Sequence, residues 1–361
     1  MTTTGRAETD ETSRGDGGGG MAGLDAAELK RLLRIMVLGR RFEEKAAEAY
    51  QMGKIGGFCH LYMGQEAVAA GTIPALRDDD YVVAAYRDHV QALARGLDAG
   101  SVMAELYGRV DGCSGGRGGS MHLFDRSRNF MGGHGIVGQH VPIAAGVGYA
   151  VRYRQRDAAC LCLFGDSVTN IGAFHEGFNM AAKWGLPVVY VCENNSYGMG
   201  TDIERVAAVE ELVDRACAYE GMASTAVDGM DVLAVRQATD EALRRAREER
   251  RPTFIEARCY RYMGHSMADP SHGTYRSREE VEEYRDDDPI LTFRDRLEEA
   301  GVITAEEYEE MDEAAIEEVE TAAEFADDSP RPEPSAVYAD VYADAYPNGI
   351  GRRDGWRPEL E

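Results

Sequence analysis

The feature that most constrains the fold is a strand–helix–strand pattern between residues 158 and 192. The apolar run AACLCLF (158–164) predicts a buried strand, residues 171–184 have the period of an amphipathic helix, and LPVVYVC (186–192) predicts a second strand. Two strands joined by one helical connection are parallel, and such a crossover is right-handed. The chain is therefore expected to have an α/β fold, a parallel sheet with helices on both faces.

The remaining chain divides into helical, irregular and polar segments. The pattern predicts helices at 24–52, 141–155 and about 230–249, a third strand at 253–262, a polar loop at 263–278 and mostly solvated helix within 279–326. Residues 53–140 are punctuated by glycine and predicted to be irregular. Two loops there, GCSGGRGGSMHLF and NFMGGHGIVGQH, are too long for simple connections, which is typical of functional loops.

We expect three parts along the chain. Residues 1–23 are polar and rich in Gly, which predicts a disordered tail. Residues 24–328 form the main domain, and residues 329–361 form a C-terminal extension that packs on the core or on a partner. Within that extension three tyrosines recur at every fourth residue, a spacing that favours one helical contact face: Tyr338, Tyr342 and Tyr346.

The strongly acidic composition excludes some partners. The 361 residues carry a formal net charge of −25, which argues against binding of nucleic acid or of an anionic membrane surface. The basic residues are almost all Arg, with Lys only at positions 30, 45, 54 and 183. One hypothesis is a GC-rich or salt-adapted source, and salt adaptation predicts that stability rises in molar salt.

Cysteine usage and the N-terminus indicate a reducing compartment. Seven Cys are scattered without a CxxC pair, which disfavours both a disulfide framework and a zinc site. The N-terminus has neither the apolar core of a signal peptide nor the acid-poor character of a transit peptide, and no apolar run reaches the roughly 18 residues of a membrane span. We therefore expect a cytoplasmic protein in which Cys160 and Cys162 are small buried packing residues.

Two neighbouring strands each lead into a residue that can bind a hard cation. Asp166 follows the strand at 158–164, and Asn195 follows the strand at 186–192. In open parallel sheets, ligands bind outside the carboxyl ends of the strands. Because Mg²⁺ takes oxygen ligands and completes its shell with phosphate and water, the two side chains and the carbonyl of Tyr197 predict a metal site. The helix expected after Asp166 would offer free N–H groups to a phosphate, since Ser167 to Gly172 are small or polar.

Each of these residues also has a plain structural explanation. Asp166 could cap a helix and Asn194–Asn195 could form a turn, but their combined spacing and topology favour the metal–diphosphate site. The segment 133–138 matches GxGxxG but follows no predicted strand, so a Rossmann NAD site is disfavoured and close approach to a flat ligand explains the glycines better. HExxH and GxSxG motifs are absent, so we expect a cofactor to supply the chemistry.

The motifs, in their order, resemble the α subunits of the thiamin-diphosphate-dependent 2-oxoacid dehydrogenases, and among these the pyruvate-specific E1 α subunits most closely. The resemblance covers roughly residues 28–345. It rests on the segments RRFEEKAAEAYQMGKIGGFCHLYMGQEAV, YRDH, GGRGGSMHLF, GGHGIVGQHVP, GDSVTNIGAFHEGFNMAAKWGLPVVYVCENNSYGMGT, VDGMDVL and YRYMGHSMADP.

The resemblance implies thiamin diphosphate and Mg²⁺ as cofactors and a role for each matched position. Asp166, Asn195 and the carbonyl of Tyr197 correspond to the metal ligands. The matched positions that bind the diphosphate are Tyr86, Arg87, Gly165, Ser167 and Val168. Gly135 and Val137 match positions whose backbone contacts the aminopyrimidine ring. His60 and His265 match histidines that act near the cofactor and the substrate. Ser266 matches a position that is phosphorylated in mitochondrial relatives, although nothing in the sequence indicates a kinase.

Two positions depart from the family pattern. The family usually has Gly after the metal-binding Asp, where this chain has Ser167, and a positive φ there would strain the backbone. The active-site loop of the family often reads His-Gly-His, where this chain has Met263-Gly264-His265, so only the second histidine can be assigned.

The resemblance also implies partners and a reaction. No acidic residue in a suitable context is evident for the pyrimidine ring, and in the family this Glu belongs to a separate E1 β subunit. The implied assembly is an α2β2 heterotetramer that decarboxylates pyruvate oxidatively and transfers the acetyl group to lipoamide of the E2 lipoyl acyltransferase. The α subunits of acetoin and branched-chain 2-oxoacid dehydrogenases share the fold and the motif, whereas FCHLY and YRDH favour pyruvate. A catalytically silent scaffold is disfavoured because Asp166, Asn195 and His265 are intact.

Overall fold

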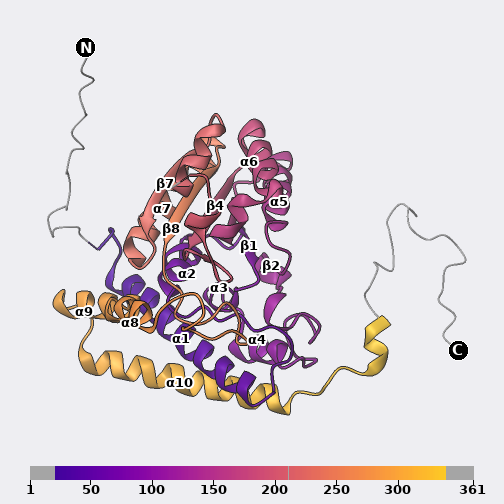
Figure 1. Ribbon diagram of the computed structural model, residues 1–361, viewed down its shortest axis with the longest axis vertical. Helices are drawn as coiled ribbons and strands as arrows, with labels where there is room; N and C mark the ends of the chain where they lie inside the picture. The colour runs from indigo at the N-terminus through magenta and orange to yellow at the C-terminus, as the bar shows by residue number, and fades with distance from the viewer. Residues whose placement is uncertain (1–20, 210, 339–361) are drawn as a thin grey trace, which may run out of the picture.

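Figure 1 shows the computed structural model, which describes residues 21–209 and 211–338. Its centre is a six-stranded sheet in which every neighbouring pair is parallel, in the order β2-β1-β3-β4-β8-β7. These strands are β2 (Phe130–His134), β1 (Tyr81–Ala85), β3 (Cys160–Gly165), β4 (Val188–Asn194), β8 (Thr253–Arg258) and β7 (Ala223–Asp228). A separate two-stranded ribbon consists of β5 (Tyr197–Gly198) and β6 (Thr201–Asp202). The expected α/β fold on a parallel sheet is confirmed.

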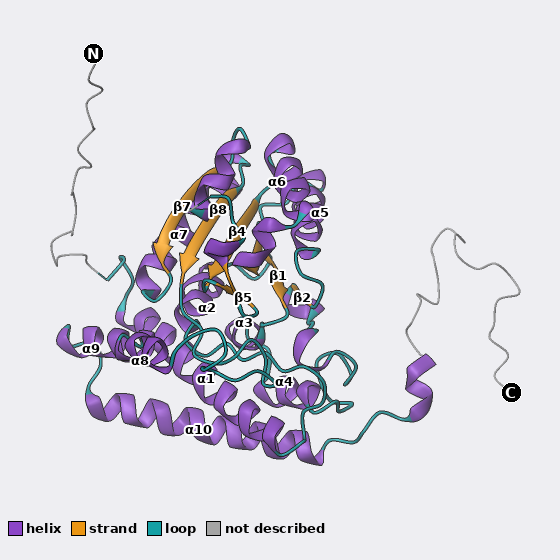
Figure 2. Ribbon diagram, in the orientation of Figure 1, coloured by secondary structure: helices purple, strands orange, loops and turns teal. Residues whose placement is uncertain are grey.

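The strand–helix–strand unit predicted from the sequence is confirmed as β3, α6 (Gly172–Trp184) and β4. Figure 2 labels α6 and β4 of this unit. The two strands pair in parallel from Cys160 opposite Val188 to Gly165 opposite Glu193. Because both strands lie in the middle of the sheet, they are buried on both faces and read as continuous apolar runs. For that reason the apolar pattern of the sequence indicates these two strands more clearly than the other strands of the sheet.

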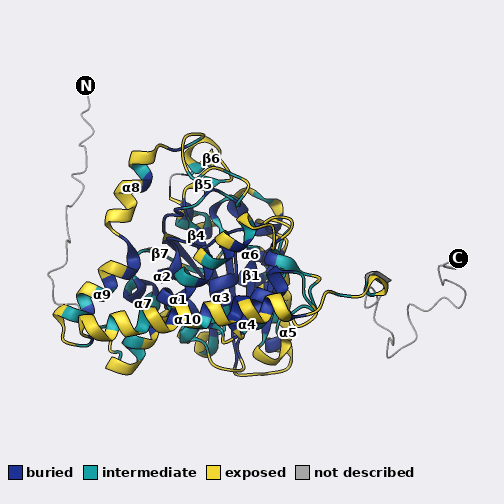
Figure 3. Ribbon diagram, turned by 90° about the horizontal axis from the view of Figure 1, so that it is seen from below, coloured by how far each residue is buried: buried dark blue, intermediate teal, exposed yellow. Residues whose placement is uncertain are grey.

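Alternate residues of the central strands face two different hydrophobic layers. Leu161 and Leu163 of β3 belong to a cluster with the helices α1 (Ala26–Gln51), α2 (Glu66–Thr72) and α7 (Val232–Arg244). Cys160 and Cys162 point to the other side, into a cluster with α6 and α5 (His140–Tyr153). Both cysteines are fully buried, as predicted. Because helices cover both faces of the sheet, exposed residues lie on the outer sides of the helices (Figure 3).

The charged stretch predicted to be helical forms three helices. They are α8 (Arg278–Asp286), α9 (Pro289–Glu299) and α10 (Ala305–Asp328). The long helices α1 and α10 lie side by side below the sheet in Figure 1. The helix α10 is solvated on only one side, because Val319 and Ala322 pack into the core.

The prediction of irregular structure for residues 53–140 was wrong in part. This segment holds β1, β2 and the helices α2, α3 (His89–Ala94) and α4 (Ala99–Leu106). Each of these elements has only five to eight residues, so its periodicity is too short to stand out. The strand predicted at 253–262 ends at Arg258, and β7 was not predicted at all.

Most of the two predicted terminal parts lies outside the described residues. Positions 1–20 and 339–361 fall there, including Tyr342 and Tyr346 of the predicted contact face. Within the described ranges, Met21 and Leu24 already pack against the core. None of the helices in those ranges combines the length and the apolar character that a membrane crossing requires.

Candidate active site

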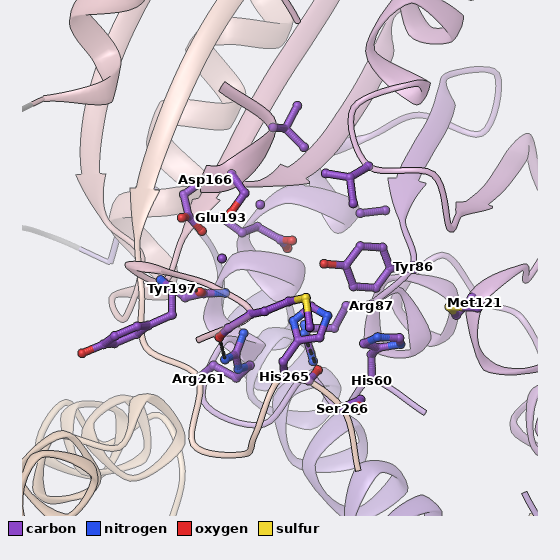
Figure 4. A pocket seen from close by; sticks show the side chains of 18 of the residues that line it. His60, Tyr86, Arg87, Met121, Asp166, Glu193, Tyr197, Arg261, His265 and Ser266 are labelled. Atoms are coloured by element: carbon purple, nitrogen blue, oxygen red, sulfur yellow. Dashed lines mark hydrogen bonds between the residues drawn. The ribbon is translucent and has the colours of Figure 1, made fainter. Parts of the chain in front are cut away.

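All twelve residues that the sequence analysis assigned to a site line one cavity. It has a volume of about 610 Å³, within the usual range for a small-molecule pocket. The residues come from six separate stretches of the chain and are His60, Tyr86, Arg87, Gly135, Val137, Gly165, Asp166, Ser167, Val168, Asn195, Tyr197 and His265. Figure 4 shows Asp166, Tyr86 and His265 around this cavity.

The topology of the sheet explains why these residues meet. The chain runs from β1 outward to the edge strand β2, then crosses back to β3 and continues outward through β4 on the other side. The strands β1 and β3 are therefore neighbours at a topological switch point, which opens a crevice at their carboxyl ends. Tyr86 and Arg87 follow β1, and Asp166 to Val168 follow β3.

Asp166 is a buried carboxylate that lacks a full set of partners. Its side chain is 2% exposed, and Oδ2 has no hydrogen-bond partner among the described residues. Burial raises the pKa of Asp166 to about 6. An orphaned carboxylate oxygen in a cavity is costly unless a cation or donor completes it, so this atom fits a metal ion.

The sequence analysis expected an α-helix to begin directly after Asp166, and this expectation was wrong. A short 3-10 helix, η4 (Asp166–Asn170), comes first, and α6 begins only at Gly172. Ser167 and Val168 still line the cavity at the start of this turn. The residues that follow β3 at the cavity therefore belong to a 3-10 turn and not to the first turn of α6.

Asn195 and Tyr197 come from a tight turn beyond β4. The Asn195 side chain donates from Nδ2 to Oε1 of Gln65 at 2.8 Å and accepts at Oδ1 from the N–H of Tyr197 at 3.3 Å. Ser196 between them has a φ of +67°, a left-handed conformation that reverses the chain. The described residues contain no group of three His, Cys, Asp or Glu that could hold a metal. A site made of one carboxylate, one amide and one carbonyl supplies hard oxygen ligands only.

Arg87 brings a buried positive charge to the cavity. Its side chain donates from Nη1 to the carbonyl of Leu61 at 2.7 Å and from Nη2 to the carbonyl of His265 at 2.8 Å. Both acceptors are neutral, although Arg87 is only 6% exposed. A buried guanidinium without a carboxylate partner fits an anionic ligand such as a phosphate.

His60, Tyr86 and His265 form an aromatic cluster on one wall. The ring centroid of His60 lies 4.6 Å from that of Tyr86 and 5.0 Å from that of His265. Burial, reinforced by the charge of Arg87, lowers the pKa of His60 far below its ordinary value. The same causes lower the pKa of His265 to about 4. Both imidazoles are therefore neutral at pH 7, when each can accept and donate a hydrogen bond.

Ser167 fits where a glycine was expected, without backbone strain. The backbone φ of Ser167 is not positive, so a side chain at this position causes no strain. Its hydroxyl lies against Gly198, where a side chain on Gly198 would collide with it. The departure from the family pattern is therefore accommodated by the missing side chain opposite it, on β5.

The glycine-rich segment 133–138 does follow a strand, contrary to the sequence analysis. It begins in β2 and leads into α5, an order that could not be recognised because β2 is short and contains two glycines. Gly135 and Val137 line the cavity, where the absence of a side chain on Gly135 leaves room beside the ring of His122.

Residues 34–335 match the family model described as dehydrogenase E1 component. The chain is 46% identical over 325 residues to the pyruvate dehydrogenase E1 component subunit alpha of Rhizobium meliloti, covering 90% of this chain and 92% of that protein. It is 44% identical to the protein of the same description from Zymomonas mobilis, covering 89% of this chain and 90% of that protein.

The chain belongs to the dehydrogenase E1 component family. This membership confirms the resemblance derived from the motifs, and it implies thiamin diphosphate as the cofactor. The relative from Rickettsia felis with the same description is 43% identical over 96% of its own length.

Among the buried polar residues that line the cavity of this E1-family chain, sequence reasoning missed several, of which three make the following contacts. Glu193 accepts hydrogen bonds from the hydroxyl of Tyr62 and from Nε2 of Gln91, and burial raises its pKa to about 7. Arg261 is 1% exposed and bonds to Met263, Met199 and Tyr275. The third is Gln65, the partner of Asn195. The only available signal was the place of Glu193 directly after the predicted strand and beside the Asn-Asn pair.

Proposed function

We propose that the chain is the α subunit of a pyruvate dehydrogenase E1 component. It would decarboxylate pyruvate oxidatively with thiamin diphosphate and Mg²⁺ and pass the acetyl group to lipoamide of an E2 lipoyl acyltransferase. The observation that carries the proposal is the single cavity at the carboxyl edge of the sheet, where all twelve predicted residues meet. The names of the relatives agree with this function, and no observation favours acetoin or branched-chain 2-oxoacids instead.

In this proposal the metal ion binds to Asp166, Asn195 and the carbonyl of Tyr197. The unpartnered Oδ2 of Asp166 supports the assignment, since a cation would satisfy it. Arg87 and Tyr86 would hold the diphosphate, together with Ser167 and Val168 of the 3-10 turn, which line the same cavity.

The other end of the cavity would take the aminopyrimidine ring. Gly135 and Val137 supply backbone groups there, and Gly135 leaves room for a flat ring. The carboxyl of Glu193 is already engaged by Tyr62 and Gln91, so we propose that the acid at the ring comes from a partner. That partner would be the E1 β subunit in an α2β2 heterotetramer.

The bound cofactor would supply an electron sink for the decarboxylation. The contribution of the chain is orientation and proton handling. Neutral His60 and His265 stand beside Tyr86 on one wall and can donate or accept a proton at ring nitrogens. Nδ1 of His60 is buried and has no partner among the described residues, so it can serve as such an atom.

The proposal extends to the rest of the chain. We place the protein in the cytoplasm, which the seven free cysteines support, and we retain 24–328 as the catalytic domain with flanking segments 1–23 and 329–361. The acidic surface gives no reason to propose a nucleic acid or membrane partner.

The test is reconstitution with the β subunit. The αβ complex should gain thermal stability from Mg²⁺ plus thiamin diphosphate but not from NAD, and it should decarboxylate pyruvate faster than branched 2-oxoacids or acetoin with an artificial electron acceptor. Asp166→Ala should abolish the cofactor effect while leaving a folded complex. A complex stabilised by NAD alone contradicts the proposal.

A further inference from the structure

Gln65 is a buried amide that contacts the predicted metal ligand Asn195. Its side chain is 1% exposed, and Oε1 accepts a hydrogen bond from Nδ2 of Asn195 at 2.8 Å. The same oxygen accepts a weaker contact from Sγ of Cys259 at 3.8 Å. Both groups that face this oxygen are donors, so it has to be the carbonyl oxygen of the amide.

Two contacts together fix the orientation of the Asn195 amide. The N–H of Tyr197 points to Oδ1 of Asn195 at 3.3 Å. If the amide were turned over, Nδ2 would face this N–H, and two donors would meet. Gln65 holds the nitrogen side and Tyr197 marks the oxygen side, so the oxygen that a cation needs remains in one place.

The stability of the fold does not explain an amide at position 65. Nε2 of Gln65 is buried and has no hydrogen-bond partner among the described residues. An unsatisfied buried donor of this kind costs about 1–3 kcal/mol, and a leucine of similar size would avoid that cost. The contact with Asn195 is a reason to retain the amide in spite of it.

The backbone places Gln65 firmly. Gly64 before it has a φ of +95°, and a side chain there would collide with the carbonyl of Tyr260. The N–H of Tyr262 donates to the carbonyl of Met63 at 3.0 Å. The segment before α2 is thus joined to the chain that leaves β8, which brings position 65 against the turn after β4.

We propose that Gln65 is a positioning residue for the metal site: it holds the amide of Asn195 so that its carbonyl oxygen stays available to the divalent cation. This inference rests on the proposed function, in which Asn195 is a metal ligand. Because Gln65 acts through Asn195, its effect should appear in metal affinity and not in the chemical step. Loss of a residue that orients a ligand typically lowers metal affinity by about 10–100-fold.

The test measures the Mg²⁺ concentration that gives half of the cofactor-induced rise in melting temperature of the αβ complex. Thiamin diphosphate is kept at about 1 mM, which is roughly tenfold or more above any Kd up to about 100 μM and so saturates the site. Gln65→Leu and Gln65→Met should raise this concentration roughly 10-fold or more. Gln65→Glu keeps an acceptor for Nδ2 of Asn195, so it should stay within about threefold of the parent.

A control separates positioning from a general loss of stability. Thr72→Val removes a buried hydroxyl from the same helix, α2, which bonds only to backbone carbonyls there. It should lower the melting temperature without changing the Mg²⁺ requirement. An unchanged requirement in both Gln65→Leu and Gln65→Met, or an equal loss in Gln65→Glu, overturns the role of Gln65 alone. A parent complex without any Mg²⁺ response overturns the proposed function together with it.

Discussion

At the residue scale, the burial of Asp166 sets the stability of the fold against the proposed role of its carboxylate as a metal ligand. Burial raises its pKa to about 6 from an ordinary value near 3.8. Folding therefore favours the protonated carboxyl group. The free energy of unfolding decreases as the pH rises from about 4 to about 6, because the unfolded chain ionises this group more readily than the folded chain does. Asp166→Asn removes this penalty, so the metal-free complex should gain stability by about 1–3 kcal/mol at pH 7.

The measurement is the melting temperature of metal-free parent and Asp166→Asn complexes between pH 4.5 and pH 8. The difference should be smallest at the acid end and reach its full size above pH 6, while the variant loses its response to Mg²⁺. A difference that does not change with pH would show that the carboxylate is not the cause.

His265 should affect the pH dependence in the opposite direction. Its pKa is lowered to about 4 by burial and by the charges of Arg87 and Arg261. In the unfolded chain this histidine is protonated below about pH 6.5, whereas in the folded chain it is protonated only below about pH 4. The free energy of unfolding therefore decreases as the pH falls between these two values. His265→Gln is neutral throughout and should lose less melting temperature than the parent between pH 7 and pH 5. His272→Gln, at an exposed histidine of the same loop, serves as the control and should follow the parent.

The site residues could be predicted from the sequence where they belong to one short motif. Asp166 and Asn195 were found because each follows an apolar strand, and a parallel sheet brings such strand ends together. Gln65 was not found, since it lies far along the chain from Asn195, the residue whose side chain it contacts. Nothing local marks a Gln before a short helix as the partner of an Asn that is 130 positions away.

At the element scale, the contact between α2 and α7 should be intolerant of any added volume. A Cβ on Gly71 would lie 2.7 Å from Cβ of Val235 and 2.9 Å from the carbonyl of Val232. Because a backbone atom is involved, the helices would have to separate. Gly71→Ala should therefore lower the free energy of unfolding by about 1–3 kcal/mol in urea titrations.

The same displacement should reach the proposed metal site, because α2 begins directly after Gln65. We expect Gly71→Ala to raise the Mg²⁺ requirement as well as lower stability. Gly56→Ala is the matched control, since a Cβ there meets no atom within 4 Å and its φ is not positive. That variant should stay within about 0.5 kcal/mol of the parent. Equal stability of the two variants would contradict the tight contact.

The elements that the sequence revealed were those in the centre of the sheet. The strands β3 and β4 are flanked by other strands and covered on both faces, so their runs 160–164 and 188–192 are apolar throughout. The edge strands gave no such signal: β2 contains two glycines, and β7 alternates between exposed and half-buried residues. A half-exposed strand of five or six residues cannot be distinguished from a loop by composition.

At the scale of the whole molecule, the net charge of −25 opposes the compact state. Ion pairs between α1 and α10 offset part of this repulsion, for example Arg41 with Asp312 and Lys30 with Glu307. Surface pairs of this kind contribute about 0–1 kcal/mol each. The two charges of such a pair are in contact, so salt screens their attraction only weakly. Repulsion between acidic side chains about 10 Å or more apart is screened more strongly, because the Debye length at 0.1 M is about 10 Å.

Added salt should therefore stabilise the protein, which would agree with the hypothesis of salt adaptation. The melting temperature should rise steadily between about 0.05 M and 1 M NaCl, a range over which the Debye length falls to roughly 3 Å. A variant with Glu309→Gln and Glu310→Gln on the exposed side of α10 carries two fewer negative charges, −23 in place of −25. Because less repulsion remains to be screened, it should start at a higher melting temperature in low salt and rise less. A flat series for the parent would mean that the ion pairs already balance the repulsion, and the acidic composition would then need another explanation.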